Sequence, residues 1–205
     1  GASTFLGAEA VAKAAPDGYT LLMGTSTFPV AMHLYRKLNY DFVRDLAPVT
    51  LIGGTLMVLV AHPTLSAKSI AELVDLARAK PGEIAYATPG LGTLTHLDME
   101  LFAAQMGVQL RHIPYRSNPL AMNDVVAGHV PLLLDFVTTG VPHIRSGKVR
   151  ALATTGLTRA AALPEVPTMH EAGVTNYEAR AWFGLFVTAG TPQEIIARLH
   201  NEVAA

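Results

Sequence analysis

The sequence lacks cysteine altogether. That absence excludes disulfide bonds, thiolate nucleophiles and cysteine-based zinc sites. Charge is also scarce, because only 15% of the 205 residues are charged and the formal net charge is −1. No basic stripe with interleaved aromatic residues occurs, which argues against a nucleic-acid partner. The longest apolar run, residues 56–61, is far shorter than the roughly 20 residues that span a bilayer, so we expect a chain that is not inserted into a membrane.

The eight histidines are scattered along the chain rather than paired. They stand at positions 33, 62, 96, 112, 129, 143, 170 and 200. No His-x-His or His-x-x-x-His pattern occurs among them, so the sequence offers no support for a metal site. His96 is kept as a candidate binding residue because it follows a glycine-rich stretch, in the first turn of an expected helix.

Half of the residues are hydrophobic, which is enough to bury a substantial core. The chain begins Gly1-Ala2-Ser3-Thr4, with no Met, basic start or apolar core, so no signal peptide is visible. The helical pattern of residues 192–205 stops without a cap. We therefore expect both ends of a larger protein to be missing.

Short apolar or β-branched runs alternate with longer amphipathic ones. The expected strands are residues 20–23, 47–51, 57–62, 84–87, 109–114, 132–136, 150–154 and 185–189. The expected helices are residues 69–79, 95–106, 119–127, 168–172 and 192–205, with a turn near 141–146. Ser69 and Glu72 have the spacing of a capping box. The alternation predicts an α/β protein with an open, mostly parallel sheet and helices on both faces.

Spacing along the chain also predicts two lobes. Helices and strands alternate most tightly from about Leu65 to Ala153, which indicates one self-contained α/β lobe. We expect residues 57–181 to form this second lobe. Residues 1–56, continued by 182–205, then form the first.

Three loops that follow predicted strands are rich in hydroxyls and glycine and poor in charge. They are residues 24–28, 88–95 and 135–140. In a parallel sheet, ligands bind beyond the carboxyl ends of the strands, where helix N-termini present free N–H groups. These loops are therefore the candidate binding site.

The first loop leaves a hydrolase open. Gly24-Thr25-Ser26-Thr27 resembles the start of a Gly-x-Ser-x-Gly nucleophile elbow, but Phe28 stands where the turn needs glycine. A polar turn and an anion-binding loop are the other readings.

The second loop, residues 88–95, leaves a nucleotide site open, because Gly90-Leu91-Gly92 after a strand begins a dinucleotide fingerprint. Thr95 stands where the third glycine belongs, and Arg111 stands where it could suit a 2′-phosphate. The same loop could simply lead into a helix with Thr93 or Thr95 as N-cap, or hold a carboxylate. In the third loop, Asp135 could cap the following turn instead of contacting a ligand.

Many stretches of the chain resemble the Bug family, the periplasmic solute receptors of tripartite tricarboxylate transporters. The resemblance begins with GAEAVAKAAPDGYTL, residues 7–21. It continues through residues 35–41, 45–49, 86–93, 96–97, 114–116, 147–153, 163–168, 171–173, 182–185 and 189–192. It therefore covers essentially the whole chain in order.

The resemblance implies a two-lobed, type II-like periplasmic binding protein, here lacking N- and C-terminal parts of the first lobe. It implies no catalysis and no cofactor. The ligand would be a small carboxylate (a di- or tricarboxylate, an acidic amino acid or an aromatic acid) held in an interlobe cleft. A monomeric receptor would deliver it to a membrane permease, or, as an alternative, report it to a signalling kinase.

The resemblance also assigns binding roles to residues of the three loops. The ligand-binding residues it implies are Thr25, Ser26, Thr27, Thr88, Gly90, Gly92, Thr93, His96, Asp135 and Phe136. The family holds its carboxylate largely with backbone N–H groups, hydroxyls and ordered waters, so uncharged donors are expected to dominate here.

Overall fold

The computed structural model describes residues 2–34 and 38–204, with the side chains of residues 2–4 left out of the description. Residues 35–37, part of the stretch 35–41 that carries the family resemblance, and residue 205 of the expected C-terminal helix lie outside the described residues. The chain divides into two compact units, Gly1–Gly54 with Ala181–Ala205, and Thr55–Arg180. Among the described residues no helix is long and apolar enough to cross a membrane.

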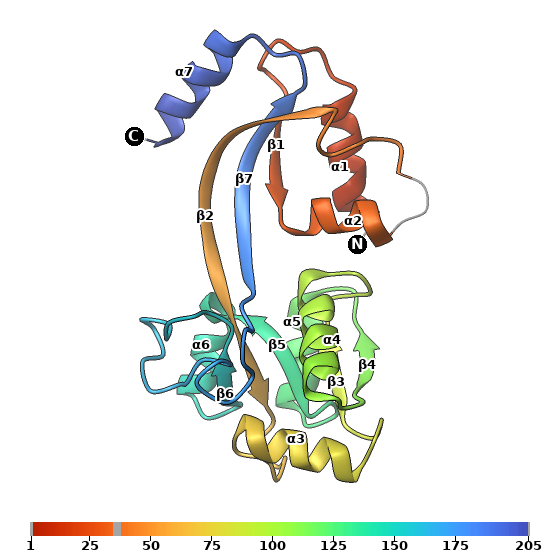
Figure 1. Ribbon diagram of the computed structural model, residues 1–205, viewed down its shortest axis with the longest axis vertical. Coiled ribbons are helices and arrows are strands. Elements are labelled where there is room, and N and C mark those ends of the chain that lie inside the picture. Colours follow the sequence, from red (N-terminus) through yellow and green to blue (C-terminus); the bar gives the residue numbers. More distant parts are fainter. Residues whose placement is uncertain (1, 35–37, 205) are drawn as a thin grey trace. The chain divides into compact units, whose positions relative to one another are not determined.

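The first unit combines both ends of the chain around a small sheet (Figure 1). Its elements are α1 (Ala2–Ala12), β1 (Leu21–Thr25), α2 (Thr27–Leu34), the first part of β2 (Leu46–Ala61), β7 (Arg180–Thr188) and α7 (Gln193–Ala204). Strand β7 lies between β1 and β2 and runs antiparallel to β1. The late segment of the chain therefore completes a sheet begun by the early one.

Aromatic side chains form the core of the first unit. Phe28 on α2 stacks on Phe42 with ring centroids 5.7 Å apart, and Phe42 lies 4.9 Å from Phe186 of β7. The hydroxyl of Thr188 donates a 2.8 Å hydrogen bond to the carbonyl of Val11, which ties α1 to the end of β7. Offset aromatic packing adds to the area that these rings bury.

The sequence analysis did not predict helices α1 and α2. α1 is rich in alanine and contains Gly7, so no clear apolar period marks it. α2 carries Pro29 as its third residue. Proline is tolerated in a first turn because the N–H it lacks has no intrahelical partner there.

The second unit is built on a mixed sheet with strand order β6-β2-β5-β3-β4. Its further elements are α3 (Ile70–Ala79), β3 (Ala85–Thr88), α4 (Leu94–Met106), β4 (Arg111–Pro114), α5 (Asn118–Val126), β5 (Leu132–Phe136), α6 (Val137–Arg145) and β6 (Arg150–Thr154). Strand β3 pairs in parallel with β4 and β5, whereas β2 runs antiparallel to β5 and β6.

The expectation of a mostly parallel sheet holds for β3, β4, β5 and β6, which run in one direction, but not for β2, which runs against them. The reason is that β3 begins at the edge of the sheet where β2 ends, with α3 at that end of the unit (Figure 1). The two expected strands 47–51 and 57–62 are also one strand of 16 residues. Gly54 lies inside this strand and does not end it. A Cβ at this position would lie 2.9 Å from the carbonyl oxygen of Ala181. That glycine allows a close approach to β7 rather than a turn.

Two other helix predictions need correction. The expected turn near 141–146 is the second half of α6, which continues through Pro142. The expected helix 168–172 is only a single turn, closed by a 2.9 Å hydrogen bond from the N–H of Ala172 to the carbonyl of Thr168. Proline and a short apolar pattern were misleading local signals in these two places.

Both faces of the second sheet are covered by helices, as the sequence predicted. Met57, Leu59 and Leu132 pack with residues of α3 and α4 on one face. Val58 and Leu133 pack with residues of α5 on the other. This period of two along strands buried on both sides explains why they read as continuous apolar runs. The α/β class is confirmed.

Asp98 is an exception inside this core. It lies on α4 at 7% exposure, and its Oδ2 atom has no hydrogen-bond partner in the described part of the chain. Burial raises the pKa of Asp98 to about 7. Because the folded pKa lies above the unfolded one, ionisation of Asp98 costs stability as the pH rises from about 4 to 7.

We therefore expect Asp98→Asn to remove part of the pH dependence of stability. The unfolding free energy of the variant minus that of the unsubstituted protein should increase by about 2–3 kcal/mol when the pH rises from about 5 to about 8. Urea unfolding at the two pH values measures this difference. Substitution of the exposed Glu83 by Gln is the control. Equal pH dependence in Asp98→Asn and the parent would contradict the expectation.

Candidate functional site

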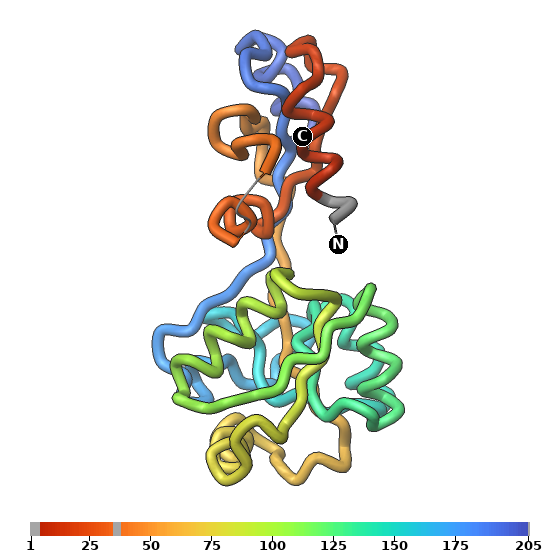
Figure 2. Tube along the Cα trace, turned by 90° about the vertical axis from the view of Figure 1, so that its right-hand side faces the viewer, coloured from red at the N-terminus to blue at the C-terminus, as the bar shows by residue number. Residues whose placement is uncertain are grey.

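The carboxyl ends of four strands meet at one edge of the second sheet. Strands β3, β4 and β5 are parallel to one another, and β5 and β6 both oppose β2. Helices α4, α5 and α6 therefore begin at this edge, which we call the carboxyl edge. In Figures 1 and 2, α3 lies at the opposite end of the unit.

None of the three helices that begin at the carboxyl edge is capped by its own N-cap side chain, although the Asp135 carboxylate accepts the N–H of Phe136 just before α6. Their N-cap residues are Thr93, Ser117 and Phe136, and none makes a side-chain cap hydrogen bond. None of the three has an acidic residue in its first turn. The first N–H groups of a helix have no intrahelical acceptor, and the helix dipole makes that end positive. The carboxyl edge is thus suited to an anion.

Helix α3, which begins at the other end of the unit, provides a contrast. The Oγ of Ser69 accepts a 3.2 Å hydrogen bond from the N–H of Glu72. The carboxylate of Glu72 accepts a 2.7 Å bond from the N–H of Lys68. The Ser69 half of the predicted capping box is therefore confirmed, whereas the return bond to Glu72 comes from the residue before the N-cap; the protein's own acid lies at the positive end of α3.

The glycine loop, residues 88–95, joins β3 to α4. Gly90 has φ +144° and Gly92 has φ +73°, both in the region that favours glycine. The Thr93 hydroxyl donates a 2.7 Å bond to the carbonyl of Gly90, whose N–H donates a 3.2 Å bond to the Oγ1 of Thr88. The loop's hydroxyls are thus engaged within it, and the free N–H groups at the start of α4 are its main available donors.

Two imidazoles contact this loop. The Nδ1 atom of His96 accepts a 3.3 Å hydrogen bond from the N–H of Gly92. The Nε2 atom of His112 lies 2.6 Å from the Oγ1 of Thr88. The sequence analysis named His112 only as one of eight scattered histidines, next to an Arg111 that could suit a nucleotide phosphate. The signal it missed is the parallel pairing of β3 and β4, which places His112 opposite Tyr86.

Asp135 binds the starts of two helices. Its Oδ1 atom accepts hydrogen bonds from the Nδ2 of Asn118 at 2.5 Å, the N–H of Phe136 at 2.8 Å and the hydroxyl of Thr139 at 2.7 Å. The side chain is buried, and this burial raises its pKa although the three hydrogen bonds oppose the shift. Of the two readings left open by the sequence, this geometry favours the capping one.

Comparison with known proteins identifies the family of this chain. The family model for the tripartite tricarboxylate transporter family receptor matches residues 1–205. The chain belongs to this receptor family. It is 37% identical over 205 residues to the protein BugT of Bordetella pertussis, with 99% of this chain and 63% of that protein covered. The resemblance to the Bug family is confirmed.

Solved structures extend the likeness to the fold of this chain. Rpa4515 of R. palustris, solved with adipate, has a TM-score of 0.89 at 35% identity and matches 100% of this chain and 69% of its own. MatC of Rhodopseudomonas palustris, solved with malate, has a TM-score of 0.87 at 32% identity and matches 100% and 70%. The fold is that of the two-lobed periplasmic binding proteins. The chain spans about three-fifths of the length of the curated relatives it matches.

The other predicted site residues of this chain fall into two groups. Phe136 lies at the carboxyl edge, partly exposed, and packs against the core on the α4 side. Thr25, Ser26 and Thr27 join β1 to α2 in the first unit, where the N–H of Thr27 donates a 3.4 Å bond to the Oγ1 of Thr25. Their relation to the second-unit loops stays a prediction.

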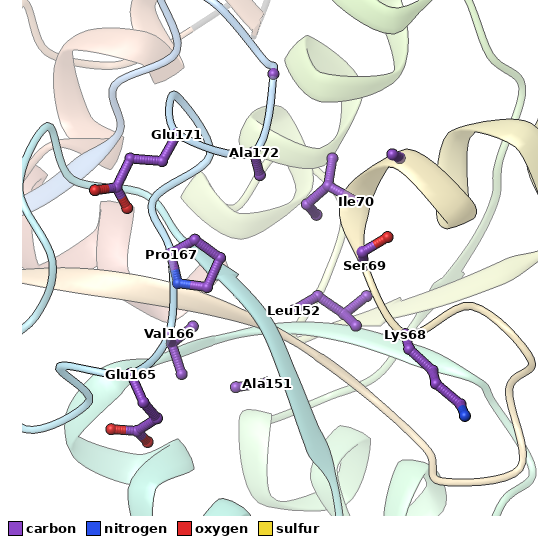
Figure 3. A pocket seen from close by; sticks show the side chains of 12 residues that line it. Lys68, Ser69, Ile70, Ala151, Leu152, Glu165, Val166, Pro167, Glu171 and Ala172 are labelled. Carbon is purple, nitrogen blue, oxygen red and sulfur yellow. The ribbon is translucent and has the colours of Figure 1, made fainter.

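A cavity of about 630 Å³ lies away from the predicted site (Figure 3). It is bounded by the start of α3, by β6 and by the segment that carries Glu165 and Glu171. None of the predicted binding residues lines it. Its α3 end is the capped one, so it lacks the free N–H groups of the carboxyl edge.

The backbone of the glycine loop yields a prediction about stability. We expect Gly90→Ala to lower the unfolding free energy by about 1–3 kcal/mol, because alanine is strained at φ +144°. Gly53→Ala is the matched control, since Gly53 has no positive φ and open space around its Cβ position. Urea unfolding compares the two. Equal stabilities for both variants would show that the loop does not hold this conformation.

Proposed function

We propose that this chain carries the carboxylate-binding site of a periplasmic receptor that delivers its ligand to a tripartite tricarboxylate transporter. The observation that carries this proposal is the carboxyl edge, where α4 and α5 begin without a side-chain cap or a first-turn acid and α6 begins beside Asp135. The ligand class is a small dicarboxylate, supported by the adipate and malate bound to two similar receptors.

Uncharged donors suit a receptor that must also release its ligand. A helix N-terminus favours an anion without presenting a full opposite charge that must be stripped of water. An arginine–carboxylate pair in the same place would bind through charge-assisted bonds that are harder to break. The site is therefore proposed to bind reversibly and to perform no reaction on its ligand.

The contacts of the glycine loop divide its residues by role. The N–H groups of Gly90 and Gly92 are bonded within the loop. We therefore assign ligand contact to the backbone N–H groups of residues 94–96 at the start of α4, together with the Thr93 hydroxyl when it turns from the Gly90 carbonyl. Thr88 is fully buried and bonded to Gly90, so its role is to hold the loop. Asp135 likewise orders α5 and α6, and Phe136 supplies an apolar wall.

The remaining assignments rest on the family. Thr25, Ser26 and Thr27 are proposed as further donors from the first unit. The periplasm is the proposed location, a membrane permease the proposed partner, and a monomer the proposed state.

Direct binding measurements test the proposal. We expect malate, adipate or citrate to bind the protein in titration calorimetry and to be recovered unchanged, as shown by NMR of the ligand. Binding of none of a broad panel of carboxylates, or steady chemical turnover of one, would contradict it.

Removing one backbone N–H tests where the anion lies. Leu94 is the first residue of α4, and Thr93 before it has φ −71° and ψ 159°, a conformation compatible with a following proline. Leu94→Pro should therefore keep the fold but weaken carboxylate binding by about 10-fold or more, since it deletes a bond to a charged group. Leu94→Ala changes the same side chain and keeps the N–H. Equal affinities for the two variants would place the anion elsewhere.

A further inference from the structure

Two histidines from different elements lie ring against ring, tilted by 38°, and both contact the glycine loop. His112 lies on β4 in register with Tyr86 of β3, whose side chain is buried on the face that α4 covers. His96 lies in the first turn of α4, and its ring centroid is 4.1 Å from that of His112. Tyr86 flanks the His112 ring at 5.1 Å.

Each imidazole supports one of the two glycines. The N–H of Gly92 donates to the Nδ1 of His96. His112 reaches Gly90 indirectly, because its Nε2 contacts the same Thr88 Oγ1 that accepts the N–H of Gly90. The two histidines thus support both positive-φ glycines of the loop, His96 directly and His112 through Thr88.

We propose that His96 and His112 are positioning residues that hold the glycine loop in its binding conformation, and that they do so only while His96 is neutral. The pair thereby makes carboxylate binding sensitive to acid. This inference rests on the proposed function for its effect on affinity, but its effect on the loop can be tested without a ligand.

The hydrogen bond at Gly92 determines the required protonation state. A backbone N–H can only donate, so the Nδ1 of His96 must keep its lone pair and the proton must be on Nε2. Protonation of Nδ1 would set two N–H groups against each other and break the contact. A charge on one ring also disfavours a charge on the other at 4.1 Å.

The surroundings of the pair favour the neutral form overall. Burial lowers the pKa of His96, and burial together with His96 lowers that of His112. Glu100 on α4 raises both values, but its carboxylate is hydrogen-bonded to the Tyr86 hydroxyl. The positive end of α4 further disfavours an imidazolium at His96.

The sign of the pH effect separates this role from direct ligand contact. If His96 bound the carboxylate itself, protonation would add an attraction and strengthen binding at low pH. If His96 holds the loop, protonation weakens binding. The two roles therefore predict opposite changes on acidification.

Imidazole NMR of the unliganded protein is the first test. Long-range ¹H–¹⁵N spectra should show His96 as the Nε2–H tautomer near neutral pH, and the Gly92 amide resonance should shift with the titration of His96. His96→Leu should move the Gly90 and Gly92 amides at neutral pH. A Gly92 amide resonance that changes neither during the titration of His96 nor in His96→Leu would overturn the proposal.

Matched variants test the consequence for binding, with malate and adipate as probes. In His96→Asn the amide oxygen replaces the Nδ1 acceptor without titrating, and in His112→Gln the side-chain amide replaces Nε2. Both should bind within about 3-fold of the parent at neutral pH, whereas His96→Leu and His112→Leu should bind about 3- to 10-fold more weakly.

The ratio of the parent's dissociation constant to that of His96→Asn cancels the titration of the ligand itself. It should rise about 3-fold or more between pH values of about 7.5 and 5. A constant ratio, or a falling one, would overturn the positioning role. If neither probe binds at any pH, the proposed ligand class fails, and the NMR result alone decides whether the histidines hold the loop.

Discussion

Parallel pairing of β3 with β4 and β5 is the constraint on which the second unit depends. It brings the carboxyl ends of these strands to one edge, so that α4, α5 and α6 start side by side there. The same pairing sets His112 opposite Tyr86 and beneath α4. Without that register the glycine loop would still turn, but nothing would lie below it to hold it and no neighbouring helix start would add donors.

Hydrogen bonds at the carboxyl edge are distributed in a way that leaves its helix ends free. The Asp135 carboxylate is used to join Asn118 and Thr139, and the hydroxyls of Thr88 and Thr93 are used within the glycine loop. Side chains thus order the edge while backbone N–H groups remain for a ligand. A carboxylate would meet backbone dipoles that are already oriented and need no reorganisation. Such dipoles attract an anion without a full opposite charge, which suits a site that must also release its ligand.

Periodicity alone was sufficient for elements with a strong local signal. Helix α3 with its Ser69–Glu72 box and strand β5 were predicted within a residue of their bounds. It failed where tertiary contacts override local preference. Gly54 permits a close approach of β7 within one long strand, and Pro29 is harmless in a first turn. The antiparallel direction of β2 was also missed, because the alternation of strands and helices in the sequence does not show whether two strands joined by a helix run parallel or antiparallel.

The sequence by itself determined the family, the α/β class and the loops that carry hydroxyls and glycine, because these are written in contiguous residues. Only the tertiary structure decided what those residues do for one another. It showed that Asp135 orders two helix starts and that His96 and His112, from a helix and a strand, lie against each other at one loop. Strand register is set by pairing between distant segments, and no local pattern encodes which side chains it brings together.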